Sequence, residues 1–391
     1  MALQAGRPGQ FRKLPSYIPA KSVDPWRPAL LLIDVGGTAT KVALRRIEKK
    51  GSEPVWRVLF EDPNEAFEDR SLPGSSLERF AAAVARRVRQ LIEPDCEYSL
   101  GLVWSNGMKS LPLVGKGISG EIINRDRYMK GEWFVKDAKD GDDLGQLFTA
   151  AFASCGFKID KILAANDTTL TMKALLGADA GMIASTGLNA TIVEEATAGE
   201  MICNAEMGGS FDFPKSWLGA GDLLAADEPC RIIEHLVAGK FLPMIFTGHI
   251  LNGPVRAEVA STVELLESKT NSGYDYYTAA DLSKLVDGTG DSEPLKMLAT
   301  LLYERSAKFA AVLALASIAG QLGQKDNFLI ALDSRLARES KFFWETLQKQ
   351  LSELMPKGKT AKLVLVDRLA VLGGQLSVPM IGAAHALDSL D

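Results

Sequence analysis

The sequence predicts a mixed α/β fold of two domains with a cleft between them. The chain has 391 residues, of which 47% are hydrophobic and 24% charged, so it is long enough for two folding units and apolar enough to bury a core. In the first half, short apolar runs typical of strands are combined with amphipathic helical segments. A similar series of short strands begins again after residue 179.

The first half is expected to form one sheet. Helices are predicted at Ser75–Glu93, where apolar residues recur at spacings of three and four, and at Asp142–Cys155. Between strands and helices lies a Gly-rich and polar stretch, Gly107–Gly141, to which we assign no regular element. The expected strands are Ala29–Asp34, Thr40–Arg46, Val55–Phe60, Tyr98–Trp104 and Ile159–Ala165. This order of strands and helices is that of a ribonuclease-H-like sheet.

The second half is expected to repeat this pattern with more helix. From Asp227 to about Leu354 the chain is predicted to be mainly helical. The expected strands are Ala180–Ser185, Thr191–Glu195, Glu200–Asn204, Phe328–Asp333 and Lys362–Asp367. The predicted division is a loose Pro-rich leader (1–27), a small domain (28–165), a large domain (166–377) and a C-terminal helix (378–391) that packs on the small domain.

Composition excludes several classes of function. The chain has 44 Lys and Arg against 49 Asp and Glu, and a net charge of -5, which argues against nucleic acid or an anionic membrane as the main partner. No apolar run approaches the roughly 20 residues of a membrane-spanning helix, and the leader has no secretion signal, so we expect a cytoplasmic protein. The four cysteines lie too far apart for a disulfide framework or a zinc site.

The first candidate site follows the first expected strand. Glycines at a turn let backbone N–H groups approach a phosphate, a threonine hydroxyl can donate to it, and a strand-end carboxylate can hold hydrated Mg²⁺. The residues with this chemistry are Asp34, Gly36, Gly37, Thr38 and Lys41. The alternative is an ordinary β-hairpin, because a Gly-Gly pair between alternating runs is also a common turn signal.

A second candidate site lies at the end of another strand, where Asn166 and Asp167 precede a helical stretch expected at Leu170–Leu176. The carboxyl ends of strands in open α/β sheets are where ligands bind, and an aspartate there can accept a proton from a hydroxyl. The alternative is helix capping by Asp167 or Thr168.

Two further motifs lie in the second half of the chain. The segment Ser185–Ala190 offers a glycine turn with hydroxyl donors, and Asn204–Gly209 places the carboxylate of Glu206 at a strand end, where it could accept hydrogen bonds from sugar hydroxyls. Either motif taken alone could be a simple turn.

Together and in this order, the motifs resemble those of the hexokinase family of the actin-like ATPase superfamily. Residues 33–41, IDVGGTATK, match the acid, glycines and threonine of the family's Asp-x-Gly-Gly-Thr-Asn-x-Arg. Residues 165–172 are similar to its Val-Asn-Asp-Thr-Val-x-Thr-Met, 185–190 to its Gly-Thr-Gly-x-Asn-Ala, and 204–208 to its Asn-x-Glu-x-Gly. The resemblance extends over most of the chain from about Leu30.

The resemblance implies two ribonuclease-H-like domains around a central cleft, with ATP, Mg²⁺ and a hexose as ligands. Asp167 would accept the proton of the sugar's primary hydroxyl, and Asp34 would hold Mg²⁺ through water. The implied sugar ligands are Ser105, Lys136, Asn166, Asn189 and Glu206. The implied nucleotide ligands are Asp34, Gly36, Gly37, Thr38, Lys41, Thr186, Gly187, Asp333 and Ser334.

The chain also departs from the family's pattern. Lys41 replaces an arginine, which keeps a cation but loses its bidentate fork. Ala39 replaces an asparagine, and Met244 falls near the place of a second sugar-binding glutamate. The loop at Ser105 lacks the family's proline, and Lys136 aligns only with a shift. The chemistry is therefore better supported than the choice of sugar.

Three other functions compete with an active hexose kinase. A catalytically weak or inactive sugar sensor is suggested by Ala39, Met244 and Arg335. A repressor/open-reading-frame/kinase-type glucokinase would be expected to carry a Cys/His zinc cluster. An actin-like or chaperone ATPase would not need sugar-binding side chains. The preferred hexose, the phosphoryl donor and the oligomeric state are left open.

Overall fold

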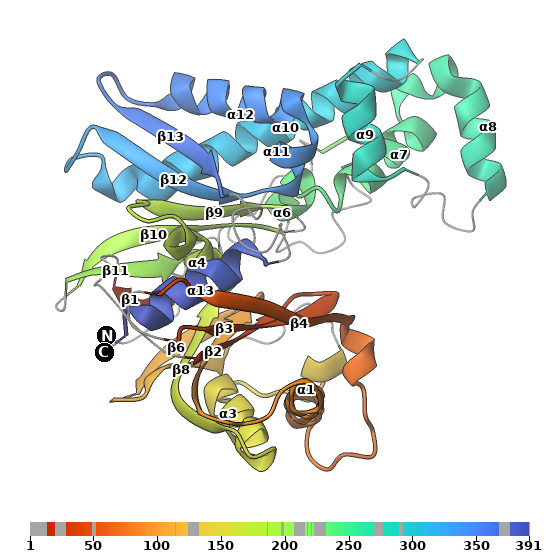
Figure 1. The fold of residues 1–391 in the computed structure, drawn as a ribbon. Helices are drawn as coiled ribbons and strands as arrows, with labels where there is room; N and C mark the ends of the chain where they lie inside the picture. Colours follow the sequence, from red (N-terminus) through yellow and green to blue (C-terminus); the bar gives the residue numbers. More distant parts are fainter. Residues whose placement is uncertain are drawn as a thin grey trace. The chain divides into compact units, whose positions relative to one another are not determined.

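The fold is described from a computed structural model of the chain (Figure 1). It describes residues 14–19, 29–48, 52–113, 115–123, 133–185, 187–196, 199–206, 216, 218–219, 221–222, 232–269, 277–288, 292–366 and 376–390. The chain forms two compact units, each described by itself. Unit 1 comprises residues 1–12, 182–190 and 205–365, and unit 2 comprises residues 13–181, 191–204 and 366–391.

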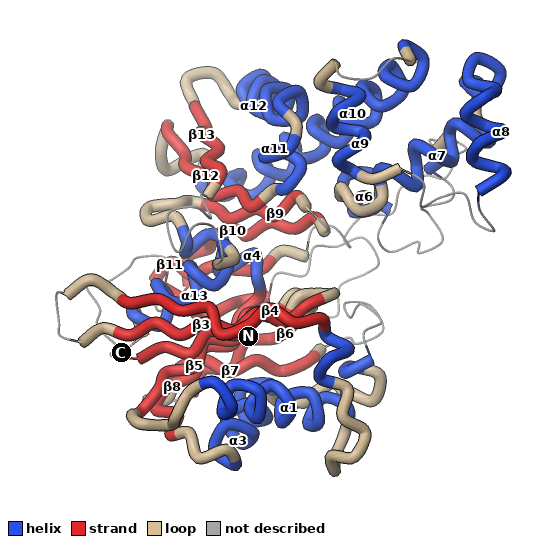
Figure 2. Tube along the Cα trace, turned by 45° about the vertical axis from the view of Figure 1, so that its right-hand side comes forward, coloured by secondary structure: helices blue, strands red, loops and turns tan. Residues whose placement is uncertain are grey.

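Unit 2 is built on a seven-stranded sheet (Figure 2). Its strands are β2 (Ala29–Val35), β3 (Ala39–Arg46), β4 (Val55–Pro63), β5 (Glu97–Trp104), β6 (Met108–Leu113), β7 (Gly117–Ile122) and β8 (Lys158–Asn166). The order is β4-β3-β2-β5-β8-β7-β6. β2, β5 and β8 pair in parallel, and β3 and β4 add antiparallel strands beside β2.

Helices cover both faces of this sheet. The helices of unit 2 are α1 (Ser76–Leu91), α3 (Leu144–Ser154), α4 (Asp167–Ala174) and α13 (Val378–Asp388), with short helices η1 (Asn64–Phe67) and η2 (Trp133–Val135). α1 and α3 pack together on one face, and α4 and α13 pack against each other on the other. Side chains of β2 alternate accordingly: Leu31 and Ile33 join the first core, and Leu30 and Leu32 the second.

A second sheet has six strands. They are β1 (Leu14–Pro19), β9 (Ala180–Ala184), β10 (Leu188–Ala196), β11 (Gly199–Asn204), β12 (Asn327–Asp333) and β13 (Thr360–Leu365), in the order β1-β11-β10-β9-β12-β13. β12 and β13 are parallel, and β9, β10 and β11 form an antiparallel meander.

Some helices of unit 1 lie beside β12 and β13, and others extend beyond these strands (Figure 1). They are α6 (Ile232–Val237), α7 (Leu242–Asn252), η6 (Pro254–Val259), α8 (Ala260–Lys269), α9 (Ala279–Val286), α10 (Glu293–Ile318), η7 (Ala319–Gln321), α11 (Arg335–Glu339) and α12 (Lys341–Leu354). α10 and α12 pack against each other, and α12 contacts β13.

The predicted elements of the first half are largely confirmed. α1 begins with a capping box in which Ser75 and Glu78 satisfy each other's backbone N–H groups. Three expectations are wrong. The leader contains β1, an edge strand that pairs with β11. The stretch 107–141 contains β6 and β7, and the helix after β8 begins at Asp167, before the expected Leu170.

The compact units divide the chain differently from the predicted domains, because residues 166–181 and 191–204 group with unit 2. Within the described ranges, no helix combines the length and apolar character needed to cross a bilayer. Cys96, Cys155 and Cys203 take part in no disulfide, and Cys230 lies outside the described residues.

Candidate active site

Three predicted strand-end motifs meet at one edge of the sheet in unit 2. In the parallel register, Val35 of β2 pairs with Trp104 of β5, and Trp104 pairs with Asn166 of β8. The carboxyl ends of the three strands are therefore level, which is where open α/β sheets bind ligands. The predicted residues brought to this edge are Asp34, Ser105, Asn166 and Asp167.

Asn166 is the residue that caps α4. Its Oδ1 accepts a hydrogen bond from the Thr168 backbone N–H at 2.9 Å, and its Nδ2 donates to the carbonyl of Trp104 at 3.3 Å. The amide is buried, and its Nδ2 also donates to the Asn106 carbonyl at 3.5 Å, which ties β8 to the segment that begins with Ser105. The alternative assignment of the cap to Asp167 or Thr168 is wrong, because Asn166 occupies that position.

Asp167 is the first residue of α4 and is half-buried. Its Oδ1 accepts from the Thr168 backbone N–H at 2.7 Å and from the Thr168 hydroxyl at 3.2 Å. A helix N-terminus favours a negatively charged side chain. The carboxylate is thus held at the strand edge by two donors of Thr168.

The predicted phosphate turn joins β2 and β3. The Gly36 N–H donates to the Ala39 carbonyl at 3.1 Å, and Gly37 and Thr38 are exposed at the tip. Lys41 stands opposite Asp34 in the antiparallel register, and its Nζ pairs with Glu61 Oε2 at 2.8 Å. A phosphate that used Lys41 would therefore share or replace the Glu61 contact.

Asp34 has a partner that the sequence did not reveal. The Ser377 hydroxyl, in the residue that precedes α13, donates a hydrogen bond to Asp34 Oδ2. Within the described residues no group of three His, Cys, Asp or Glu side chains could enclose a metal ion. A single carboxylate at a strand end fits Mg²⁺, which keeps several waters and binds proteins through one or two carboxylates plus substrate phosphates.

Lys136 lies in an exposed turn that is anchored from both sides. Phe134 stacks on Phe80 with ring centroids 4.3 Å apart, and both Asp137 carboxylate oxygens accept from the Ser76 backbone N–H at 2.9 and 3.0 Å. Burial acts to raise the pKa of Asp137, but the hydrogen bonds from Ser76 outweigh it and lower that pKa. Lys136 is exposed, and the residues on either side of it are held in place by these contacts.

Unit 1 brings together the second glycine turn and the end of β12. The Ser185 N–H donates to the Gly187 carbonyl at 2.9 Å, and the Ser185 carbonyl accepts from the Gly239 N–H at 2.8 Å. Ser334 is fully buried, and its hydroxyl donates to the Ala184 carbonyl at 2.5 Å. Thr186 lies outside the described residues.

The end of β12 is also committed to local bonds. Ser334 Oγ accepts from the Ala337 N–H at 3.1 Å and so caps α11, and Asp333 Oδ1 accepts from Arg338 at 2.7 Å. These bonds favour a role for Ser334 in fixing the turn rather than in touching a ligand with its hydroxyl.

Glu206 has an unusual backbone. Among the described residues other than glycine it alone has a positive φ, 47°. This conformation is uncommon for a side chain of this size and is often found at functional sites. The preceding Ala205 N–H donates to the Ala190 carbonyl at 3.1 Å, next to Asn189 of β10. The two predicted sugar ligands Asn189 and Glu206, both half-buried, are therefore held on neighbouring strand ends.

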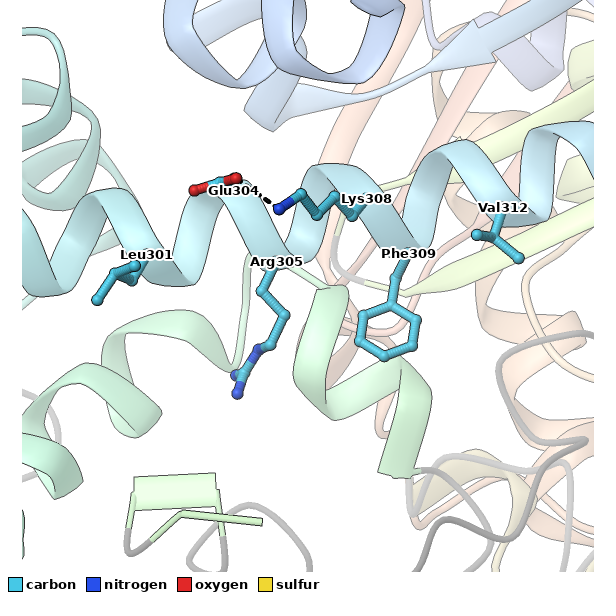
Figure 3. A pocket seen from close by; sticks show the side chains of 6 residues that line it. All are labelled: Leu301, Glu304, Arg305, Lys308, Phe309 and Val312. Atoms are coloured by element: carbon cyan, nitrogen blue, oxygen red, sulfur yellow. Dashed lines mark ion pairs between the residues drawn. The ribbon is translucent and has the colours of Figure 1, made fainter. Parts of the chain in front are cut away.

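A pocket of about 410 Å³ lies along α10 and contains none of the predicted site residues (Figure 3). Its lining residues are Leu301, Glu304, Arg305, Lys308, Phe309 and Val312. Lys308 pairs with Glu304, and Arg305 forms a bidentate pair with the buried Asp222 at 2.8 and 2.9 Å. Its charged groups therefore already have partners, and the pocket is not part of the candidate site.

Solved structures with similar folds were found by comparison. A Schistosoma mansoni hexokinase complexed with glucose aligns with a TM-score of 0.67, 17% identity, and coverage of 96% of this chain and 89% of that one. Another hexokinase structure aligns with a TM-score of 0.66 and 18% identity, and the alignment covers 96% of this chain and 88% of that one. A Balamuthia mandrillaris glucokinase in complex with glucose aligns with a TM-score of 0.56 and 16% identity, and the alignment covers 92% of this chain and 93% of that one. No family model and no curated protein sequence matches the chain.

This similarity establishes the fold. The chain has the two-domain, actin-like ATPase fold in which hexokinases are built, as the order of its motifs predicted. Sequence reasoning missed Asn64 and Ser377, whose side chains bond to the Gly36 carbonyl and to Asp34. The only local signal for Asn64 was its place after Pro63 at a strand end.

Proposed function

We propose that the chain is a hexose kinase that transfers the γ-phosphate of ATP to the 6-hydroxyl of a hexose such as glucose. The observation that carries this proposal is the level register of β2, β5 and β8, which gathers Asp34, Ser105, Asn166 and Asp167 at one sheet edge. An ATPase without a sugar substrate could use the same proton acceptor for water, but it would not need the additional amide and hydroxyl groups of Asn166 and Ser105 for sugar hydroxyls. The fold shared with a glucose-bound hexokinase and a glucose-bound glucokinase supports the same choice.

In this proposal Asp167 accepts the proton of the sugar's primary hydroxyl while that oxygen attacks the γ-phosphorus. The bond from the γ-phosphorus to the bridging oxygen breaks, and ADP leaves. The residues assigned to the hexose hydroxyls are Ser105, Lys136, Asn166, Asn189 and Glu206. General-base assistance contributes about 10²–10⁴-fold, and positioning and charge stabilisation supply most of the rest.

The nucleotide is assigned to the two glycine turns. Backbone N–H groups of Gly37 and Gly187 and the hydroxyls of Thr38 and Thr186 donate to phosphate oxygens, with Lys41 as the nearby cation. Gly36, whose own N–H is bonded to the Ala39 carbonyl, closes the turn beside the phosphate. Asp333 and Ser334 shape the adenosine side. Asp34 would hold Mg²⁺ through water, and Ser377 fixes the orientation of that carboxylate. Mg²⁺ bound there would offset charge on the phosphate oxygens.

Changing Glu206 should separate sugar binding from nucleotide binding. Glu206→Gln removes a charged acceptor of sugar hydroxyls, and hydrogen bonds to charged groups are the stronger ones, so the Kd for glucose should rise about tenfold or more. The Kd for ATP should change little. Titration calorimetry with each ligand measures both constants, and Glu234→Gln in α6 of the same unit is the control. Equal weakening of the two ligands would contradict the role of Glu206.

A coupled assay of ADP release against several hexoses, combined with calorimetry for the same sugars, tests the proposed function. We expect glucose both to bind and to cause ADP release. A protein that binds glucose but turns over neither ATP, other nucleoside triphosphates nor pyrophosphate would instead be the inactive sugar sensor suggested by Met244 near the expected second carboxylate.

A further inference from the structure

Asn64 has side-chain and backbone bonds to two elements of the candidate site. It follows Pro63 at the end of β4 and begins η1, and only 2% of its surface is exposed. A buried amide has to find partners for both its donor and its acceptor. These partners belong to the phosphate turn, and the Asn64 carbonyl is bonded to Trp133 in the segment that leads to Lys136.

Three hydrogen bonds join Asn64 to the turn and to the start of β3. Its backbone N–H donates to the Thr38 carbonyl at 3.1 Å, and its Nδ2 donates to the Gly36 carbonyl at 2.9 Å. Its Oδ1 accepts from the Thr40 hydroxyl at 2.8 Å. The peptide planes that follow Gly36 and Thr38 are therefore held from below the tip, and this fixes the direction in which the turn's N–H groups point.

Only an amide side chain of this length supplies both bonds. Asn64→Ala would leave the Gly36 carbonyl and the buried Thr40 hydroxyl without this partner. Asn64→Asp would still accept from Thr40 but would place a carboxylate oxygen against the Gly36 carbonyl, where two acceptors repel. Asn64 and Thr40 are both buried, so the loss of the bond between them is not made good by water.

A fourth bond leads to the other element. The Trp133 indole Nε1 donates to the Asn64 carbonyl at 3.3 Å. Trp133 begins η2, and the exposed Lys136 follows directly after it. Trp133 is also packed edge-on against Phe80 and Phe134. One buried residue is thus bonded to both the phosphate turn and the segment of Lys136.

We propose that Asn64 is a positioning residue that holds the Gly36–Thr38 turn in its phosphate-binding form and ties it to the Lys136 segment. The inference rests on the proposed function, which assigns phosphate to the turn and hexose to Lys136. The Asn64 side chain holds the turn in place and should therefore affect the binding of ATP. The Asn64 backbone carbonyl holds the Trp133 indole and should therefore affect the binding of the hexose.

Hydrogen–deuterium exchange tests whether Asn64 holds the turn in place, and this measurement does not depend on enzymatic activity. In Asn64→Ala, peptides that cover residues 34–41 should exchange faster than in the wild type, because the turn loses two of its bonds. Ser119→Ala is the matched control: Ser119 is also fully buried and hydrogen-bonded in unit 2, to Asp143 and Gly145, and its loss should leave these peptides unchanged. Unchanged exchange of these peptides in Asn64→Ala would contradict the proposal that Asn64 holds the turn.

Steady-state kinetics test whether the hydrogen bonds of Asn64 to the turn contribute to the binding of ATP. Asn64→Ala should raise the KM for ATP about tenfold, the effect of losing two net hydrogen bonds, with little change in the KM for glucose. Thr40→Val should act in the same direction, and Thr40→Ser, which keeps the hydroxyl, should restore the wild-type value. Faster exchange of the turn with an unchanged KM for ATP would overturn the positioning role.

Trp133→Phe tests the tie to the hexose side. It removes the indole N–H but keeps an aromatic ring, so the KM for glucose should rise while the KM for ATP stays constant. An unchanged KM for glucose would overturn the tie. If the wild-type chain showed no hexose-dependent turnover, the proposed function would fail, and the exchange experiment would still decide whether Asn64 braces the turn.

Discussion

Asp167→Asn should lower hexose-dependent ADP release by about 10²–10⁴-fold, the usual worth of a positioned proton acceptor. The amide is close in size to the carboxylate and can still accept from the Thr168 N–H, which Asp167 bonds at 2.7 Å, so α4 should keep its start. Glucose and ATP should bind nearly as before, because Asn166 remains the cap of the helix. The loss should therefore appear in kcat and not in KM.

Asp143→Asn is the matched control for this variant. Asp143 also lies at a helix start in unit 2, where it caps α3 by accepting from the Gln146 N–H, and asparagine caps helices equally well. Asp143 is not among the residues assigned to the hexose, the nucleotide or Mg²⁺, so the kcat of the Asp143→Asn variant should stay near the wild-type value. An Asp167→Asn enzyme that kept most of its kcat would show that Asp167 is not the proton acceptor.

Arg45→Met should destabilise unit 2 by about 3–5 kcal/mol, the usual cost of removing one partner of a buried ion pair and leaving the other charge buried without a counter-ion. The Arg45 and Asp388 side chains are only 5% and 10% exposed and form a bidentate pair between β3 and the last residue of α13. The Arg45 guanidinium also lies over the Trp56 ring, 5.9 Å from its centroid. Urea titration measures the change in the free energy of unfolding.

The neighbouring pair of Arg46 and Asp95 is the control, since it too is bidentate but is 38% and 49% exposed. Arg46→Met should cost about 0–1 kcal/mol, as exposed pairs do. Replacing both buried partners, as in Arg45→Met with Asp388→Leu, should recover much of the loss. Equal losses in Arg45→Met and Arg46→Met would contradict the role of burial.

The buried pair also bears on the site. α13 is fixed at its end by Arg45, and the residue before its start, Ser377, donates to Asp34. Loosening the far end of the helix should therefore disturb the carboxylate that we assign to Mg²⁺. No short motif could have shown this, because the residues of each pair are 343 positions apart in the sequence.

Elements with strong local patterns were predicted from the sequence. The apolar run of β2 and the three-and-four spacing of α1 each describe one buried face, and both elements form where expected. The strand ends carried Asp34, Asn166 and Asp167, so the chemistry of the sheet edge could be anticipated. That the ends of β2, β5 and β8 are level is a consequence of parallel pairing, which the predicted topology implied.

The missed strands have sequences that look like loops. Gly117 has a φ of 105°, and a Cβ there would lie 2.0 Å from the Ile162 carbonyl oxygen, so β7 needs glycine to approach β8 closely. β1 contains prolines at both Pro15 and Pro19, which an edge strand tolerates because it need not donate along its outer side. In both cases a tertiary contact decides the structure, and composition alone favours a turn.

The central claim is that this chain moves phosphate from ATP to a hexose hydroxyl. The most direct measurement is ³¹P NMR of the wild-type chain with ATP, Mg²⁺ and glucose. We expect ADP and a sugar 6-phosphate ester to appear in equal amounts, with almost no inorganic phosphate, and no reaction when glucose is left out. Inorganic phosphate formed at the same rate with or without glucose, or an unchanged ATP spectrum, would contradict the account.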